Sequence, residues 1–207
     1  MHPNATFRRE PEARSRAFAA ERGFGVLCVS ADPTPLLAHV PFRLEGDAAD
    51  LHLMRSNPLA RALAGGPQPA VLAVSGPDAY ISPDWYGVED QVPTWNYVAV
   101  HLSGQLSLRP DTTLRPLLDR LSEHFETQLT PKPPWTTDKM SPGTMERMMR
   151  MLVSCRLSID RVESTWKLGQ NKAPAARDGA ARGIDDAAIG QDPRLVAALM
   201  RGLPEGP

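Results

Sequence analysis

The chain has 207 residues, of which 42% are hydrophobic and 23% are charged, and its formal net charge is −1. This size and composition are typical of one globular domain, with or without a tail. The balanced charge gives no electrostatic footprint for nucleic acid, and no apolar run of 18 residues predicts a membrane span.

The N-terminal stretch has no basic start followed by an apolar segment, so it does not resemble a signal peptide. The two cysteines, Cys28 and Cys155, lie far apart in apolar surroundings. We expect both to be small buried hydrophobic residues rather than a disulfide or a metal pair. These features predict a reduced, cytoplasmic protein.

The first half of the chain predicts mainly strands. A short helix is expected over 11–22, where Pro11 suits the first helical position and Gly23 the stop. Strands with a hairpin at 45–48, and one further short helix over 56–66, follow. The expected strands are 23–30, 35–44, 50–54, 69–76 and 79–82.

The second half begins with a long strand over 92–109, in which apolar residues alternate and Gly104 is expected to mark a bulge or bend. An amphipathic helix over 112–129 follows. A second helix is predicted over 143–154, with a stripe that we interpret as core or dimer contact and that consists of Met145, Met148, Met149 and Leu152. The remaining expectations are a Pro-rich connection (131–142), a last strand (155–164), an Ala/Gly/Asp-rich stretch (173–190) and a short closing helix (193–202).

The order of these elements is not a strand–helix alternation, which argues against a doubly wound sheet. It predicts a mainly β fold: a closed antiparallel barrel with peripheral helices. Residues 1–172 are expected to form this barrel domain. Residues 173–207 are expected to be an Ala/Gly-rich connection and a C-terminal helix that packs on the domain or trails it.

Several chemistries lack their sequence signals. There is no glycine-rich phosphate loop, and the five histidines show no metal-ligand spacing, so we expect no metal. No GxSxG motif occurs, and scattered Ser, His and Asp residues do not support a catalytic triad. No catalytic residue is assigned.

Aromatic and small polar residues gather in the stretch 79–105. A hairpin-like return would bring Ser82, Trp85 and Tyr86 near Thr94, Trp95 and Asn96. Flat apolar faces beside hydroxyl and amide groups suit a planar heterocycle with polar edges. The alternative is a folding corner in which the aromatic rings fill the end of the barrel.

Two further segments could hold polar parts of a ligand. Arg55, Ser56 and Asn57 fall where a strand ends and a helix begins, an arrangement that suits a phosphate. The alternative is an ordinary helix cap. A cation with an amide pair, Lys167 with Gln170 and Asn171, ends the last strand, and its alternative is a solvated turn.

These segments resemble the PaiB family, described as FMN-binding negative transcriptional regulators and similar to the FMN-binding split-barrel flavoproteins. The resemblance rests on "AHVPF", "RSNPLARAL", "YISPDWY", "VPTWNYVAVH" and "WKLGQN", which occur in this order between residues 7 and 171. It implies a split β-barrel and a homodimer with FMN at the dimer interface. It also implies that the three groups of residues named above contact the flavin.

Two departures from the family pattern bear on the expected cofactor. The loop over 87–91, "GVEDQ", is short and acidic, and its charge works against binding of a phosphate. Gly169 stands where the family pattern has a serine, which removes one hydroxyl and loosens the backbone.

The resemblance implies a homodimeric, FMN-binding transcriptional regulator. The alternatives are an NAD(P)H-dependent flavin oxidoreductase, or a haem-handling split barrel in which His39, His52 or His101 would be axial. Direct contact with DNA is possible, although neither the net charge nor a helix-turn-helix supports it.

Overall fold

The computed structural model describes residues 1–203, so the last four residues of the expected C-terminal segment 173–207 lie outside the described part. The strands are β1 (Phe24–Val29), β2 (Leu36–Glu45), β3 (Ala48–Met54), β4 (Gln68–Ile81), β5 (Thr94–Leu108) and β6 (Leu152–Lys167). The α-helices are α1 (Glu12–Arg22), α2 (Pro58–Ala62), α3 (Leu114–Glu126), α4 (Thr144–Met149), α5 (Pro174–Asp186) and α6 (Pro193–Arg201). Short 3-10 turns are η1 (Ala5–Arg8), η2 (Leu63–Gly65), η3 (Pro83–Tyr86), η4 (Asp111–Thr113) and η5 (Thr137–Lys139).

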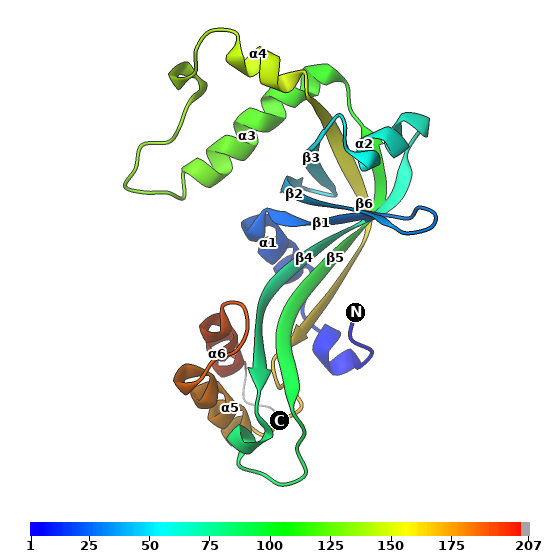
Figure 1. Ribbon diagram of the computed structural model, residues 1–207. Helices are drawn as coiled ribbons and strands as arrows, with labels where there is room; N and C mark the ends of the chain where they lie inside the picture. The colour runs from blue at the N-terminus through cyan, green and yellow to red at the C-terminus, as the bar shows by residue number, and fades with distance from the viewer. Residues whose placement is uncertain (204–207) are drawn as a thin grey trace. The chain divides into compact units, whose positions relative to one another are not determined.

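The six strands form a closed barrel in the order β1-β2-β3-β6-β5-β4 (Figure 1). The hairpin expected at 45–48 is present, since Glu45 pairs with Ala48 across a two-residue turn. β3 runs antiparallel to β6, with Asp50 opposite Arg156. The prediction of an antiparallel barrel with peripheral helices is therefore confirmed.

Contacts divide the chain into two compact units. The barrel unit comprises residues 16–74 and 101–162. The terminal unit comprises residues 1–15, 75–100 and 163–203. Strands β1 to β3 and helices α2 to α4 belong to the barrel unit, whereas η3, α5 and α6 belong to the terminal unit.

The core of the barrel unit follows the period of two in its strands. Leu27 and Val29 on β1, and Leu51 and Leu53 on β3, are buried, while their neighbours on the opposite face are covered less well. Alternate residues of a strand point to opposite faces, so one face fills the barrel and the other is free to carry polar groups. Helix α3 packs against β2 and β3 and buries Leu114, Leu117 and Leu121, as its amphipathic pattern predicts.

Strand β4 differs from the prediction, which split it into 69–76 and 79–82. Gly76, Pro77 and Asp78 indicated a turn, yet the strand continues through them. The backbone N–H groups of Asp78 and Tyr80 donate to the carbonyls of Gln191 and Ile189, each at 2.9 Å. A segment far along the chain thus pairs with β4, a contact that local sequence cannot reveal.

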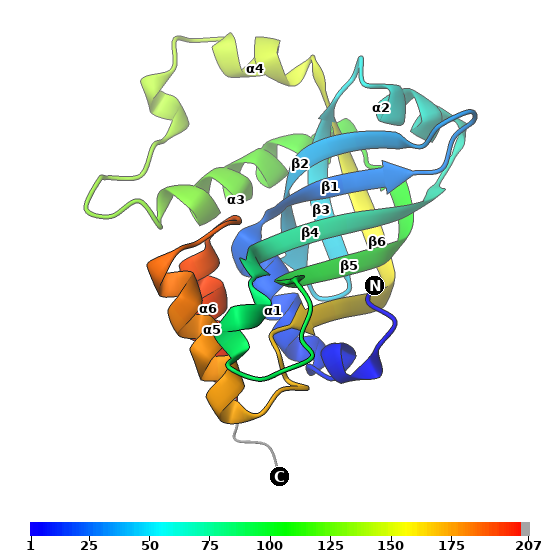
Figure 2. The same cartoon turned by 60° about the horizontal axis from the view of Figure 1, so that its bottom comes forward.

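The helix expected over 143–154 ends at Met149, and β6 begins at Leu152 rather than at Cys155. Leu152 and Val153 pair with Met54 and Leu53 of β3, so sheet pairing outweighs the helical spacing of the methionines. Helix α4 contains no buried residue, so its methionines are not part of a core within this chain. Figure 2 shows the connection between α3 and α4 standing clear of the strands of the barrel unit.

The Ala/Gly/Asp-rich stretch 173–190, expected to be a connection, contains helix α5. Pro174 occupies the first helical turn, where its missing N–H has no intrahelical partner to lose. Ala180, Ala181 and Ile184 are fully buried, and α5 packs against α6 and η3. Small residues lower the hydrophobicity of a segment but can still be buried. The composition of this segment therefore did not indicate a packed helix.

Gly104 is explained by a close backbone approach. A Cβ atom at this position would lie 1.8 Å from the carbonyl oxygen of Ser158 on β6, so any side chain would force the strands apart.

Both cysteines are free, with Cys155 fully buried and Cys28 half-buried. Burial raises the pKa of the Cys155 thiol to about 12. None of the described helices is both long and apolar enough to cross a membrane.

Candidate functional site

The turn η3 forms a packed corner of the terminal unit. A Cβ atom on Gly183 of α5 would lie 2.2 Å from the Trp85 ring, so the indole rests directly on this glycine. Tyr86 is buried, and burial raises the pKa of its phenol. The ammonium of Lys172 lies 5.0 Å from the Tyr86 ring centroid, within range of a cation–π interaction. Trp85 and Tyr86 therefore serve at least as packing groups.

The start of β5 presents a different aromatic group. The Trp95 side chain is 45% exposed and meets the ring of Tyr80 edge-on, with 6.0 Å between the ring centroids. Its neighbour Asn96 is only 1% exposed and donates to the sulfur of Met200 at 3.4 Å. Among the aromatic residues named in the sequence prediction, Trp95 is the one with an open surface.

Lys167, at the end of β6, forms hydrogen bonds to the start of β5. Its ammonium donates to the hydroxyl of Thr94 and to the carbonyl oxygen of Trp95, the latter at 2.7 Å. Burial lowers the pKa of Lys167, and the nearby charge of Lys172 lowers it further. The lysine thus fixes the backbone at the residue that carries the exposed indole.

The turn after β6 is held by its own side chains. Gln170 accepts a hydrogen bond from the Leu168 N–H at 2.8 Å and donates to the carbonyl of Trp166. Gly169 has φ +79°, a conformation that glycine adopts without steric cost, so glycine suits this position better than serine. Asn171 is exposed and Ser82 is half-buried. Gln170 therefore has a structural role, whatever else it contacts.

The short acidic loop 87–91 carries Glu89 and Asp90 on its exposed surface. Lys172 donates to the side-chain oxygen of Gln91 at the end of the loop. A cation thus lies at the end of the acidic loop, where its charge offsets part of the repulsion that the loop would exert on a phosphate.

The third predicted group lies in the barrel unit, and its polar atoms are largely engaged. Arg55 donates to the carbonyls of Arg150 and Leu152 at 3.3 and 3.0 Å and pairs with Asp111 at 3.6 Å. Asn57 caps α2 by accepting from the Leu59 N–H at 2.9 Å. The five-residue helix gives only a weak dipole. The cap alternative is observed, and Ser56 remains exposed.

The structure thus brings Lys167 into direct contact with Thr94 and Trp95. The next residue in the sequence, Asn96, is buried. Ser82, Trp85, Tyr86, Gln170 and Asn171 belong to the same terminal unit. Arg55, Ser56 and Asn57 belong to the other unit. Contact of all these residues with a flavin stays a prediction.

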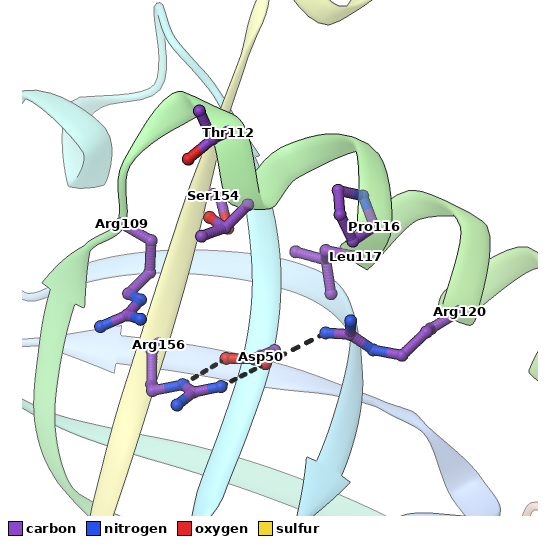
Figure 3. Close-up of a pocket in the computed structure, with 9 residues that line it drawn as sticks. Asp50, Arg109, Thr112, Pro116, Leu117, Arg120, Ser154 and Arg156 are labelled. Carbon is purple, nitrogen blue, oxygen red and sulfur yellow. Dashed lines mark hydrogen bonds and ion pairs between the residues drawn. The ribbon is translucent and has the colours of Figure 1, made fainter.

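Sequence reasoning missed a polar pocket on the barrel unit. Its residues are Asp50, Arg109, Thr112, Thr113, Pro116, Leu117, Arg120, Ser154 and Arg156, which we call the arginine pocket (Figure 3). Asp50 and Arg156 are charged residues that alternate with buried apolar residues on their strands. Without the strand register, nothing in the sequence showed that these positions face each other. No group of three or more potential metal-ligand side chains occurs among residues 1–203.

Comparison with solved structures places the fold. The FAD- and haem-binding protein from Mycobacterium smegmatis superposes with a TM-score of 0.57 at 18% identity, covering 79% of this chain and 74% of that one. The flavocytochrome Anf3 from Azotobacter vinelandii gives 0.55 at 13% identity, covering 80% and 72%. The class of fold that these structures define is the split β-barrel.

Sequence comparison narrows the class to a family. The family described as "Putative FMN-binding domain" matches residues 1–161. The protease synthase and sporulation protein PAI 2 of Bacillus subtilis is 31% identical over 159 residues, which cover 75% of each chain. The chain belongs to this FMN-binding, PaiB-type family, and the resemblance noted in the sequence is confirmed. Lys167, Gln170 and Asn171 lie beyond the residues that the family match covers.

Proposed function

We propose that the chain binds FMN and that the exposed indole of Trp95 contacts the flavin ring. The observation that carries this proposal is the exposed indole of Trp95, whose backbone carbonyl is held by the ammonium of Lys167. An exposed flat aromatic face fits a planar heterocycle, on which it can stack. Membership of an FMN-binding family supports the choice of ligand.

The roles of the individual residues follow from their contacts. Trp95 would supply stacking area, and Tyr80 holds the indole edge-on from the neighbouring strand. Lys167 would orient a polar edge of the ligand while it anchors the Trp95 carbonyl. When bound, FMN supplies reversible electron and hydride transfer, whereas the residues of this chain bind and orient it.

We also propose that the protein acts as a homodimeric regulator of transcription, the role that the family description implies. The formal net charge of −1 gives little attraction for the DNA backbone. Regulation through binding of the flavin, rather than through a large basic surface, is consistent with this charge. The sporulation-related name of the Bacillus subtilis relative supports a regulatory setting.

The test is a titration of the purified chain with FMN, followed by quenching of flavin fluorescence. Replacement of Trp95 by alanine should weaken FMN binding by roughly tenfold, because a stacking contact contributes about 1–1.5 kcal/mol. Trp135→Ala is the matched control, since Trp135 lies in the α3–α4 connection of the barrel unit.

Saturation at one FMN per chain, lost selectively in Trp95→Ala, would support the proposal. Absence of saturation in the unmodified chain would rule out FMN as the ligand. Equal affinity of Trp95→Ala and Trp135→Ala would place the flavin away from the Trp95 indole.

A further inference from the structure

The arginine pocket combines a cavity with an excess of positive charge. Its volume is about 250 Å³, and its lining holds three arginines but only one carboxylate, that of Asp50. Glu45, outside the lining, pairs with Arg120 at 3.5 Å. Even with Glu45 included, the guanidinium groups outnumber the carboxylates, so the pocket favours an anion.

Asp50 orients two of the three guanidinium groups. Its carboxylate is 7% exposed and accepts from Arg156 at 2.6 and 2.7 Å, a bidentate pair. Arg120 donates to the same carboxylate at 3.4 Å. Both oxygens are therefore occupied, and Arg156 and Arg120 are held in place with further N–H groups to offer (Figure 3).

Other donors at the pocket have no partner. The guanidinium of Arg109 makes no hydrogen bond or ion pair with any described residue, and Figure 3 shows it beside the Asp50 group without a bond to it. The Nε atom of Arg120 is buried and has no hydrogen-bond partner within residues 1–203, with only an ion pair to Glu45 at 3.5 Å. A buried donor without a hydrogen bond is costly, which points to a group that it binds.

The first turn of α3 adds to this arrangement. Thr112 and Thr113 precede the helix and line the pocket together with Pro116. The Thr113 hydroxyl is engaged, because it donates to the Pro110 carbonyl at 2.7 Å, whereas that of Thr112 has no partner in the described chain. The 13-residue helix directs the positive end of its dipole toward the same side.

We propose that the arginine pocket binds a phosphate group. A guanidinium fork, a free hydroxyl and a helix N-terminus are the donors that proteins use for phosphate. The cavity is smaller than the roughly 300–1,000 Å³ pockets that enclose whole drug-sized ligands, so it suits a phosphate and the atoms next to it. This site belongs to the barrel unit. The observations that support it are independent of those that support the proposal for Trp95.

The first experiment is a calorimetric titration of the full chain with inorganic phosphate. Arg109→Ala should weaken binding roughly ten- to a hundredfold, since a charge-assisted hydrogen bond is lost. Arg109 is exposed and unpaired within the described residues, so its replacement should leave the fold intact. Arg22→Ala, which removes an exposed charge on α1 within the same unit, should leave phosphate binding unchanged.

The phosphate could belong to FMN or to a separate phosphate ester, and titrations with FMN and riboflavin distinguish these sources. If Arg109→Ala weakens FMN but not riboflavin, the pocket holds the flavin phosphate. If only inorganic phosphate is affected, the ligand is a different ester. The proposal is overturned if the chain binds no inorganic phosphate and FMN affinity is the same in both variants. Phosphate binding without FMN binding would retain the pocket and remove the flavin proposal.

Discussion

His52 shows how a single buried nitrogen makes stability depend on pH. It lies on the outward face of β3, and its Nδ1 has no hydrogen-bond partner among the residues described. Burial lowers the pKa of this histidine below its usual value near 6.5. The folded protein therefore takes up the proton less readily than the unfolded chain, in which the histidine is solvated.

We predict that the unfolding free energy falls as the pH drops below about 6.5 toward the lowered folded-state pKa. Above pH 6.5 the contribution of His52 is fully present, because the side chain is neutral in both states. His52→Gln should flatten this part of the profile in urea unfolding measured from pH 5 to 8. A variant profile with the same slope as the original would show that other groups cause the dependence.

At the level of residues, the sequence indicated which segments hold polar and aromatic groups, but not the role of each residue in them. Asn57 was expected either to cap a helix or to hold a phosphate, and the structure shows the cap. Nothing in the sequence distinguished Trp85 from Trp95. In the structure the Trp85 indole packs on Gly183, whereas the Trp95 indole is exposed. Arg109 carried no local signal, because its pocket forms from three segments that are distant in sequence.

Helix α5 depends on two glycines that admit the Trp85 side chain and backbone. A Cβ atom at Gly179 would lie 2.4 Å from the Trp85 carbonyl oxygen, and one at Gly183 would lie 2.2 Å from the indole. Alanine normally stabilises a helix relative to glycine. Here steric overlap with η3 opposes that gain, since the contact leaves no space for a methyl group.

We predict that Gly183→Ala lowers the unfolding free energy by about 1–3 kcal/mol, the usual cost of overpacking. Thermal unfolding would measure the change, and Gly65→Ala is the control, because a methyl group there would meet nothing within 4 Å. Combining Gly183→Ala with Trp85→Ala should remove most of the added cost. Strict additivity of the two changes would contradict the proposed contact.

Among the secondary-structure elements, those with strong periodicity were predicted well. The alternation in β5 and the leucine stripe of α3 gave their boundaries to within a few residues. Strand β4 was wrongly divided, because its partner segment at 189–191 comes more than a hundred residues later. The start of β6 was missed because pairing with β3 overrides the helical pattern around Met149.

For the whole molecule, the unpaired methionines of α4 bear on assembly. Met148 of α4 and Met151, two residues after the helix, are 47% and 48% exposed, and no residue of α4 is buried. Exposed apolar side chains grouped on one short segment are typical of an interaction surface. The interpretation of this stripe as a dimer contact therefore remains, whereas the interpretation as core does not.

We predict that light scattering gives a mass twice that of the 22.6 kDa chain. Replacement of Met148 and Met151 together by glutamate should shift the mass toward the monomer, because two charges would be buried in the contact. Leu195→Glu, at an exposed position on α6, is the control and should leave the mass unchanged. A monomeric mass for the unmodified chain at every concentration would refute the dimer.

The barrel itself was predictable, since strand order, hairpin chemistry and the family resemblance all indicated one architecture. The division into compact units was not, because it depends on pairings between the two ends of the chain. The backbone N–H of His2 donates to Thr165 at 3.0 Å, and Ser15 bonds to Ser164 at 2.8 Å. These contacts span more than 140 positions and leave no trace in local composition.

The same contacts set an order of events during synthesis. On the ribosome, every residue of the barrel unit has been made once Val162 is added, so that unit can fold first. Residues 1–15 are made well before Ser164, Thr165 and Trp166, to which His2 and Ser15 bond. The contacts of residues 1–15 can therefore form only after those of the barrel unit, and Trp95 gains its bond from Lys167 at the same late stage.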